Sequence, residues 1–85
     1  MSWSTSWLGR PSAVCREMEK YGESLSGNSK EEFDSVKDAI KTIVSANDDA
    51  CAVHVDANGH GYVAADGTKS STCNVSVRRF GFLAV

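Results

Sequence analysis

The 85 residues, 41% of them hydrophobic and 24% charged, are enough for one folded domain that spans residues 1–85. Nine basic residues against eleven acidic ones give a net charge of -2, which excludes the dense basic face that extended nucleic-acid binding needs. The three cysteines are an odd number without paired spacing, so we expect reduced thiols and no disulfide framework.

The chain carries no pattern of a membrane or secretory segment. Residues 1–12 (MSWSTSWLGRPS) lack the basic region followed by an apolar region that a secretory signal contains. No apolar run approaches the roughly 18 residues that a membrane span needs. We therefore expect a cytoplasmic protein that is not secreted and has no membrane partner.

The N-terminal part predicts a short extended segment followed by a helix. Residues 1–9 alternate small polar residues with Trp3 and Trp7, which suits either an edge strand with both indoles on one face or an arm docked on the core. Pro11 is typical of the first turn of a helix, so we expect a helix over residues 11–26. Its apolar stripe would consist of Val14, Met18, Tyr21 and Leu25.

A second helix is expected over residues 30–46. Gly27-Asn28 is typical of the end of the preceding helix, and Ser29 with Glu32 has the spacing of a capping box. The short link makes the two helices antiparallel neighbours. The apolar face of the second helix would consist of Phe33, Val36, Ile40, Ile43 and Val44.

A hairpin follows, with strands over residues 50–57 and 60–66. Asn58-Gly59 predicts a two-residue turn, because both turn positions need positive φ. In the register that this turn sets, Val55 lies opposite Tyr62. The face toward the helices would carry Val53, Val55 and Tyr62, and the opposite face His54, Asp56, Val63 and Ala65.

A third strand is expected over residues 72–80, followed by an apolar tail over residues 81–85. The element order is therefore (β)ααβββ, and the fold class is α+β. We expect two antiparallel helices packed on one face of a three- to four-stranded antiparallel β-meander. The other sheet face would carry small and polar residues.

Catalytic and metal-binding residue types do not converge in this pattern. His54, Asp56 and His60 include the residue types of a metal site, but in the expected register His60 points to the face opposite the other two. The cysteines are expected to be small buried hydrophobes rather than nucleophiles: Cys15, Cys51 and Cys73. We expect no metal, no cofactor and no catalytic residue, and therefore no enzyme.

A small positive cluster near the strand ends is the first candidate binding site. A carboxylate or phosphate of a ligand or partner could pair with it. Solvated surface charge is the alternative interpretation. The cluster consists of Lys69, Arg78, Arg79 and His60.

The apolar side chains at both ends of the chain are the second candidate. A domain this small can hardly bury all of them, so they predict an interface with another protein or between protomers of a homo-oligomer. A tail folded back as an extra strand is the alternative. The interface would consist of Trp3, Trp7, Phe80, Phe82, Leu83 and Val85.

Four short motifs carry a resemblance to a known group of proteins. Met1-Ser2-Trp3 begins the chain, an amphipathic helical middle covers residues 29–46, Gly59-His60-Gly61 lies in the hairpin, and Asn74-Val75-Ser76-Val77 lies in the last strand. In these features the chain resembles a loose set of small accessory proteins encoded by bacteriophages and prophages. The resemblance implies an accessory protein without an assigned reaction, so no catalytic residue is carried over.

These observations favour a non-enzymatic protein in the cytoplasm of a host cell that binds a host protein, for example as an inhibitor of a defence system. One alternative is an oligomeric sponge for a small anionic ligand such as a nucleotide, held between protomers by Arg78, Arg79 and Lys69. A second alternative is a structural component of a virion. A third, an enzyme that uses cysteine and histidine, has the least support.

Overall fold

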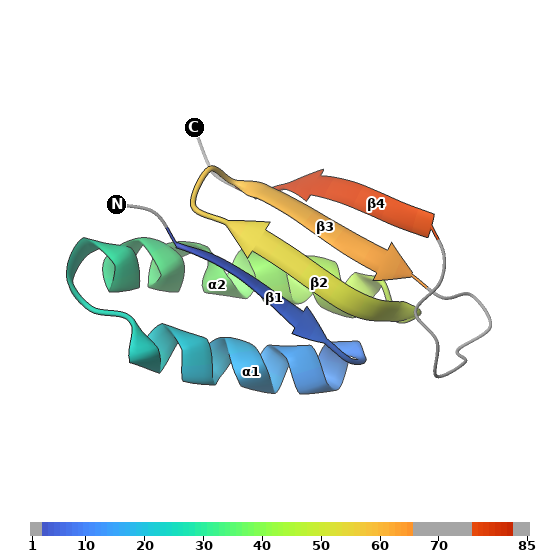
Figure 1. Cartoon of the computed structure of the whole chain (residues 1–85), viewed down its shortest axis with the longest axis horizontal. Coiled ribbons are helices and arrows are strands. Elements are labelled where there is room, and N and C mark those ends of the chain that lie inside the picture. Colours follow the sequence, from blue (N-terminus) through green and yellow to red (C-terminus); the bar gives the residue numbers. More distant parts are fainter. Residues whose placement is uncertain (1–2, 66–75, 83–85) are drawn as a thin grey trace.

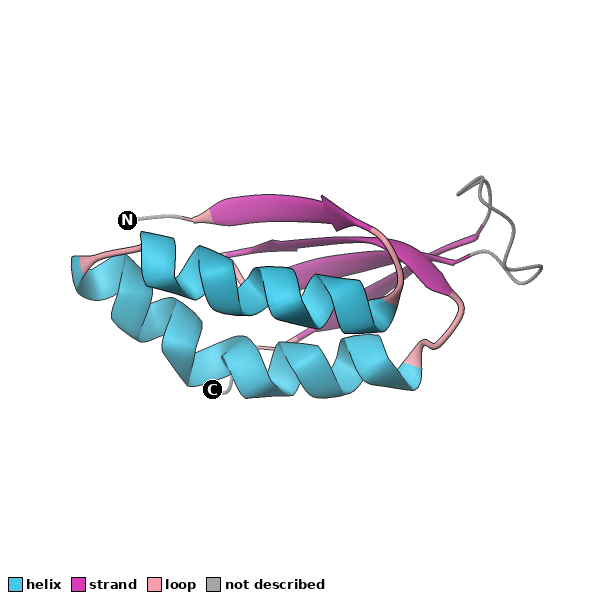
Figure 2. Ribbon diagram, turned by 90° about the horizontal axis from the view of Figure 1, so that it is seen from below, coloured by secondary structure: helices cyan, strands magenta, loops and turns pink. Residues whose placement is uncertain are grey.

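Two helices lie against one face of a four-stranded antiparallel sheet in the computed structural model, which describes residues 3–65 and 76–82 (Figures 1 and 2). The strands lie side by side in sequence order, β1-β2-β3-β4, and each neighbouring pair is antiparallel. The predicted α+β class and (β)ααβββ order are confirmed, and the N-terminal segment is an edge strand. The elements are β1 (Ser4–Leu8), α1 (Pro11–Ser24), α2 (Gly27–Ala46), β2 (Ala50–Asp56), β3 (His60–Ala65) and β4 (Ser76–Gly81).

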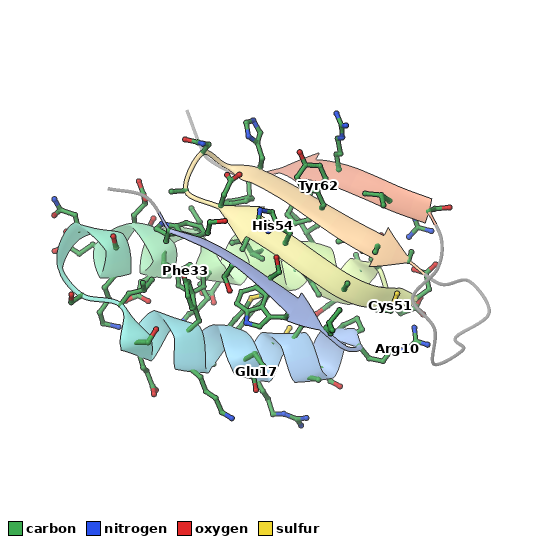
Figure 3. All side chains as sticks on the ribbon, viewed as in Figure 1. Arg10, Glu17, Phe33, Cys51, His54 and Tyr62 are labelled. Atoms are coloured by element: carbon green, nitrogen blue, oxygen red, sulfur yellow. The ribbon has the colours of Figure 1, made fainter. Side chains whose placement is uncertain are left out.

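The core lies between the helices and the sheet. The apolar stripes predicted for the two helices supply one side of it, with Phe33 completely buried in the middle (Figure 3). Alternate residues of β2 and β3 supply the other side, as a half-buried antiparallel sheet requires. The largest fully buried side chains are Phe33, Met18, Ile40, Val14, Val44, Val53, Val55 and Val63.

The start of α2 differs from the predicted capping box. The helix begins at Gly27, three residues earlier than expected, and Ser26 is its N-cap without a side-chain hydrogen bond. Ser29 is buried within the first turn. The carboxylate of Glu32 is engaged elsewhere, because it accepts a hydrogen bond of 2.8 Å from the indole N–H of Trp3. A tertiary contact has therefore replaced the local cap.

The turn of the β2–β3 hairpin has three residues instead of two. The Asp56 carboxylate accepts hydrogen bonds from the backbone N–H of Asn58 at 2.9 Å and of His60 at 3.2 Å. Gly59 has a φ of 85°, which a glycine adopts without strain. The side chain of Asp56 thus organises a longer turn than Asn58-Gly59 alone predicts.

The longer turn shifts the hairpin register by one residue, so the predicted pairing was wrong. Val55 lies opposite Gly61, and His54 lies opposite Tyr62. A shift of one residue exchanges the two faces of a strand. Val63 and Ala65 are therefore buried against the helices, whereas Tyr62 lies on the opposite face, 36% exposed.

Part of the predicted third strand and of the cysteine assignment falls outside the described residues. β4 runs over Ser76–Gly81, and residues 72–75 are not among those described. Cys51 is disulfide-bonded, so the expectation that all thiols are reduced was wrong for this residue. Cys15 is free and half-buried at the edge of the apolar stripe of α1.

Candidate functional site: the sheet face opposite the helices

The face of the sheet turned away from the helices, which we call the outer face, carries its side chains in transverse rows. In antiparallel pairs, directly opposed residues point to the same side. One row crosses all four strands and is polar: Ser6 is paired with His54, His54 with Tyr62, and Tyr62 with Arg79. We call these four residues the polar row.

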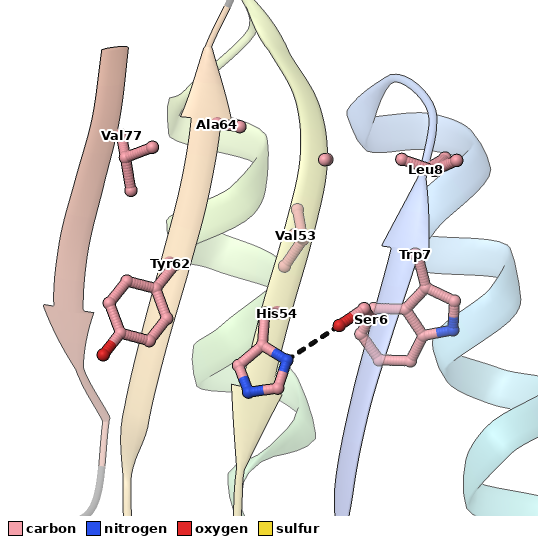
Figure 4. A pocket seen from close by; sticks show the side chains of 9 residues that line it. Ser6, Trp7, Leu8, Val53, His54, Tyr62, Ala64 and Val77 are labelled. Carbon is pink, nitrogen blue, oxygen red and sulfur yellow. Dashed lines mark hydrogen bonds between the residues drawn. The ribbon is translucent and has the colours of Figure 1, made fainter. Parts of the chain in front are cut away.

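The side chains of the polar row touch one another in sequence. Ser6 Oγ and His54 Nδ1 share a hydrogen bond of 2.7 Å (Figure 4). The rings of His54 and Tyr62 have centroids 6.0 Å apart, and Arg79 Cζ lies 5.6 Å from the centroid of the Tyr62 ring. Tyr62 therefore stands between an imidazole and a guanidinium, in the range of a cation–π contact.

The neighbouring row on the outer face is apolar. Leu8, Ala52, Ala64 and Val77 are paired across β1, β2, β3 and β4. Leu8 and Val77, on the outer strands, are 85% and 62% exposed. The two alanines between them leave a depression of about 170 Å³, which the polar row bounds at His54 and Tyr62 (Figure 4). We call these four residues the apolar row.

A third row lies at the hairpin end of the outer face. Ser4 is paired with Asp56, and His60 with Gly81. In the observed register His60 shares the outer face with His54 and Asp56, so the reason given for rejecting a metal site was wrong. One oxygen of Asp56 is engaged by turn amides, however. Within residues 3–65 and 76–82, no group of three or more His, Cys, Asp or Glu is placed to hold a metal ion.

The predicted positive cluster is divided between the two faces of the sheet. Arg78 lies on the helix side, where its two terminal nitrogens each donate to one carboxylate oxygen of Asp49 at 3.1 Å. This pairing holds the pKa of Asp49 below its usual range, against the opposing effect of burial. Arg79 lies on the outer face, and Lys69 is outside the described residues. The structure therefore does not bring the four predicted residues together.

The predicted apolar interface is largely part of the core. Trp3 is only 3% exposed and meets Phe33 edge-to-face at 5.0 Å. Phe33 in turn contacts Tyr21, which contacts Trp7 at 6.0 Å. Both tryptophans thus fix β1 to the helices: Trp3 is buried in the core, whereas Trp7 is half-buried and also lines the depression described above. Phe80 and Phe82 also pack against the core, and Leu83 and Val85 lie outside the described residues.

The exposed apolar side chains are different ones. Among the described residues, the large hydrophobic side chains that remain exposed are Leu8, Tyr62 and Val77, and all three lie on the outer face. The alternation of residues 2–8 could have pointed to Leu8, since it falls opposite the tryptophans. Tyr62 was missed because the hairpin register was shifted.

Ser6 and His54 have the spacing of a nucleophile and its base, but they lie on an open surface. Such a pair also needs a group that orients the base and donors that stabilise an oxyanion. In the described part of the chain, His54 has a hydrogen bond to Ser6 and to no other side chain. Within the described residues the pair therefore has no side chain that orients the base, and we treat it as part of the polar row.

Comparisons with protein-family models, with curated proteins and with solved structures found no match to this chain. Neither described helix combines the length and the apolar character that crossing a membrane would require. The arrangement of the outer face is therefore the observation from which a function has to be argued.

Proposed function

We propose that this chain is a non-enzymatic protein-binding module that contacts its partner through the outer face of the sheet. One observation carries the proposal: the large hydrophobic side chains that stay exposed among the described residues gather on the sheet face opposite the two described helices (Figure 2). Contiguous exposed apolar surface of this kind marks interaction sites in soluble proteins.

The composition of the outer face supports protein recognition in particular. Tyrosine and arginine are enriched among the residues that contribute most to binding energy in protein interfaces. Tyr62 and Arg79 are stacked on each other beside the apolar row. The polar row would select among partners, and the apolar row would supply the buried area.

The resemblance to phage accessory proteins makes a host protein, such as a component of a defence system, the partner that we propose. A virion component could use the same face and remains the second candidate. The anionic sponge is less well supported, because Arg78 is already paired with Asp49 of its own chain. Disulfides are rare in the cytosol, so the bonded Cys51 gives no support to a cytoplasmic location.

The experiment compares capture by two variants. Leu8→Ser with Val77→Ser removes the exposed walls of the apolar row without touching the core. Lys20→Ser with Glu23→Ser changes exposed residues of α1 and is the matched control. A partner captured from the host-cell lysate is purified, and its binding to each variant is then measured. We expect it to bind the control variant but not the outer-face variant.

Chemical-shift mapping of the purified complex locates the contact. We expect the largest perturbations at the backbone amides of Leu8, His54, Tyr62 and Val77. The proposal is contradicted if the partner binds both variants equally. It is also contradicted if the largest chemical-shift perturbations fall on the exposed sides of α1 and α2.

A further inference from the structure

We propose that the outer face recognises an acidic segment of its partner, in which a bulky apolar side chain enters the depression and a neighbouring carboxylate pairs with Arg79. This inference rests on the proposed function and specifies the chemistry of the partner.

The depression has the size of a single large side chain. Its volume is about 170 Å³, and the small side chains of Ala52 and Ala64 are among those that line it. An apolar cavity of about 150 Å³ is known to accommodate a benzene ring. Leu8 and Val77 on either side would enclose the flanks of an inserted leucine, phenylalanine or tryptophan. Burying such an anchor in a pocket is the usual basis of a binding hot spot.

Among the described residues, Arg79 is a cation of the outer face that has no carboxylate partner. The ion pairs among the described residues do not include it. Its neighbour Arg78 already makes a two-pronged pair with Asp49 on the other face. Stacking on Tyr62 holds the Arg79 guanidinium in place, so less side-chain entropy is lost when an anion binds.

The depression and Arg79 are close enough for one short segment of a partner to reach both. Arg79 and Val77 are two residues apart on β4, which separates them by about 7 Å along the strand. An extended segment presents side chains two positions apart at the same spacing, and a helix presents positions three or four apart at about 6 Å. The partner therefore needs an Asp or Glu within four positions of its apolar anchor.

A second copy of this chain, docked through the same face, fits the charges less well. The carboxylate described on the outer face is that of Asp56, and one of its oxygens already accepts two turn amides. Two such faces would bring Arg79 toward other polar-row residues rather than toward an available carboxylate. Self-association through this face is therefore an outcome that the test has to distinguish.

The test selects short random peptides from a display library on the immobilised full chain. We expect enriched peptides to carry a leucine, phenylalanine or tryptophan within four positions of an Asp or Glu. Synthetic versions of these peptides are then measured against three variants. Arg79→Gln should weaken binding about tenfold or more, because it removes a charge-assisted hydrogen bond. Ala64→Leu, which fills the depression, should abolish binding.

Arg78→Gln is the matched control, since it removes the adjacent arginine from the helix side of the sheet and should leave peptide binding unchanged. Thermal unfolding of each variant checks that it is folded. Enriched peptides without an acidic residue, equal binding to the Arg79→Gln variant, or no enrichment over the Ala64→Leu variant would each overturn the inference. If the chain self-associates and Ala64→Leu abolishes that self-association, the inference is overturned, because the outer face then binds a second copy of this chain. None of these outcomes affects the mapping experiment above, so a failure of this inference can be distinguished from a failure of the proposed function.

Discussion

The ring of Phe80 on β4 lies directly against the backbone of Gly61 on β3, its partner in the sheet. A Cβ atom built on Gly61 would lie 2.2 Å from Phe80 Cζ, far inside normal contact distance. Glycine at this position therefore lets an aromatic ring from the edge strand fold over the sheet and join the core. This contact packs β4 against β3 and the core.

We predict that Gly61→Ala lowers the free energy of unfolding by about 1–3 kcal/mol, because the ring of Phe80 must move out of its position. Gly81→Ala is the matched control, since its added Cβ would meet only the backbone oxygen of Gly59 at 3.7 Å. Chemical denaturation of both variants measures the difference. Equal stability of the two variants would contradict the close packing of Phe80 on Gly61.

The hairpin register makes a second prediction, tested by one substitution at two positions. Val63 is completely buried against the helices, whereas Val77 is 62% exposed on the outer face. Val63→Thr places a hydroxyl in the core and should cost about 1–3 kcal/mol of unfolding free energy. Val77→Thr should cost less than about 0.5 kcal/mol. In the register expected from a two-residue turn, Val63 would face away from the helices and tolerate threonine.

The placement of Trp3 makes a third prediction. Trp3→Ala should lower the free energy of unfolding by about 3–5 kcal/mol, since the indole is buried against Phe33 and its N–H is bonded to Glu32. Trp3→Phe retains an aromatic ring and should recover part of that loss. If the predicted interface role were correct, the alanine variant would be as stable as the parent chain and would lose only binding. Urea denaturation distinguishes the two outcomes.

The helices, the strands and their order could be predicted because each depends on local periodicity. The stripe from Phe33 to Val44 and the alternation from Cys51 to Val55 are readable without knowing what packs on them. The hairpin register could not be predicted in this way, because it depends on whether the Asp56 side chain or the backbone of Asn58-Gly59 closes the turn. The hydrogen bonds of one side chain, Asp56, decide between two registers that place opposite faces in the core.

The candidate site was less predictable than the fold for a related reason. Its apolar row joins residues from four different strands, and Leu8 meets Ala52 only through the pairing of β1 with β2. The tryptophans were assigned to an interface because the available core area was underestimated. Edge-to-face contacts among Trp3, Phe33 and Tyr21 absorb that apolar surface within the chain.

The pair formed by Asp49 and Arg78 makes a fourth prediction, which concerns pH. Two hydrogen bonds from Arg78 lower the pKa of Asp49 in the folded chain below its usual 3.8. A carboxyl whose pKa is lower in the folded state stabilises the fold fully above its unfolded pKa. That stabilisation is lost as the pH falls through the folded pKa. Asp49→Asn should therefore lower stability at neutral pH, by an amount that shrinks as the pH falls below about 4.

The control for this prediction is Asp48→Asn, which changes the adjacent, exposed carboxylate that does not pair with Arg78. Thermal unfolding of the parent chain and of both variants, followed from neutral to acidic pH, measures the effect. The Asp48 variant should follow the parent chain over the whole range. A stability loss in the Asp49 variant that stays constant down to acidic pH would mean that Arg78 does not stabilise the charged form of Asp49. In that case the two hydrogen bonds would contribute no more than neutral ones.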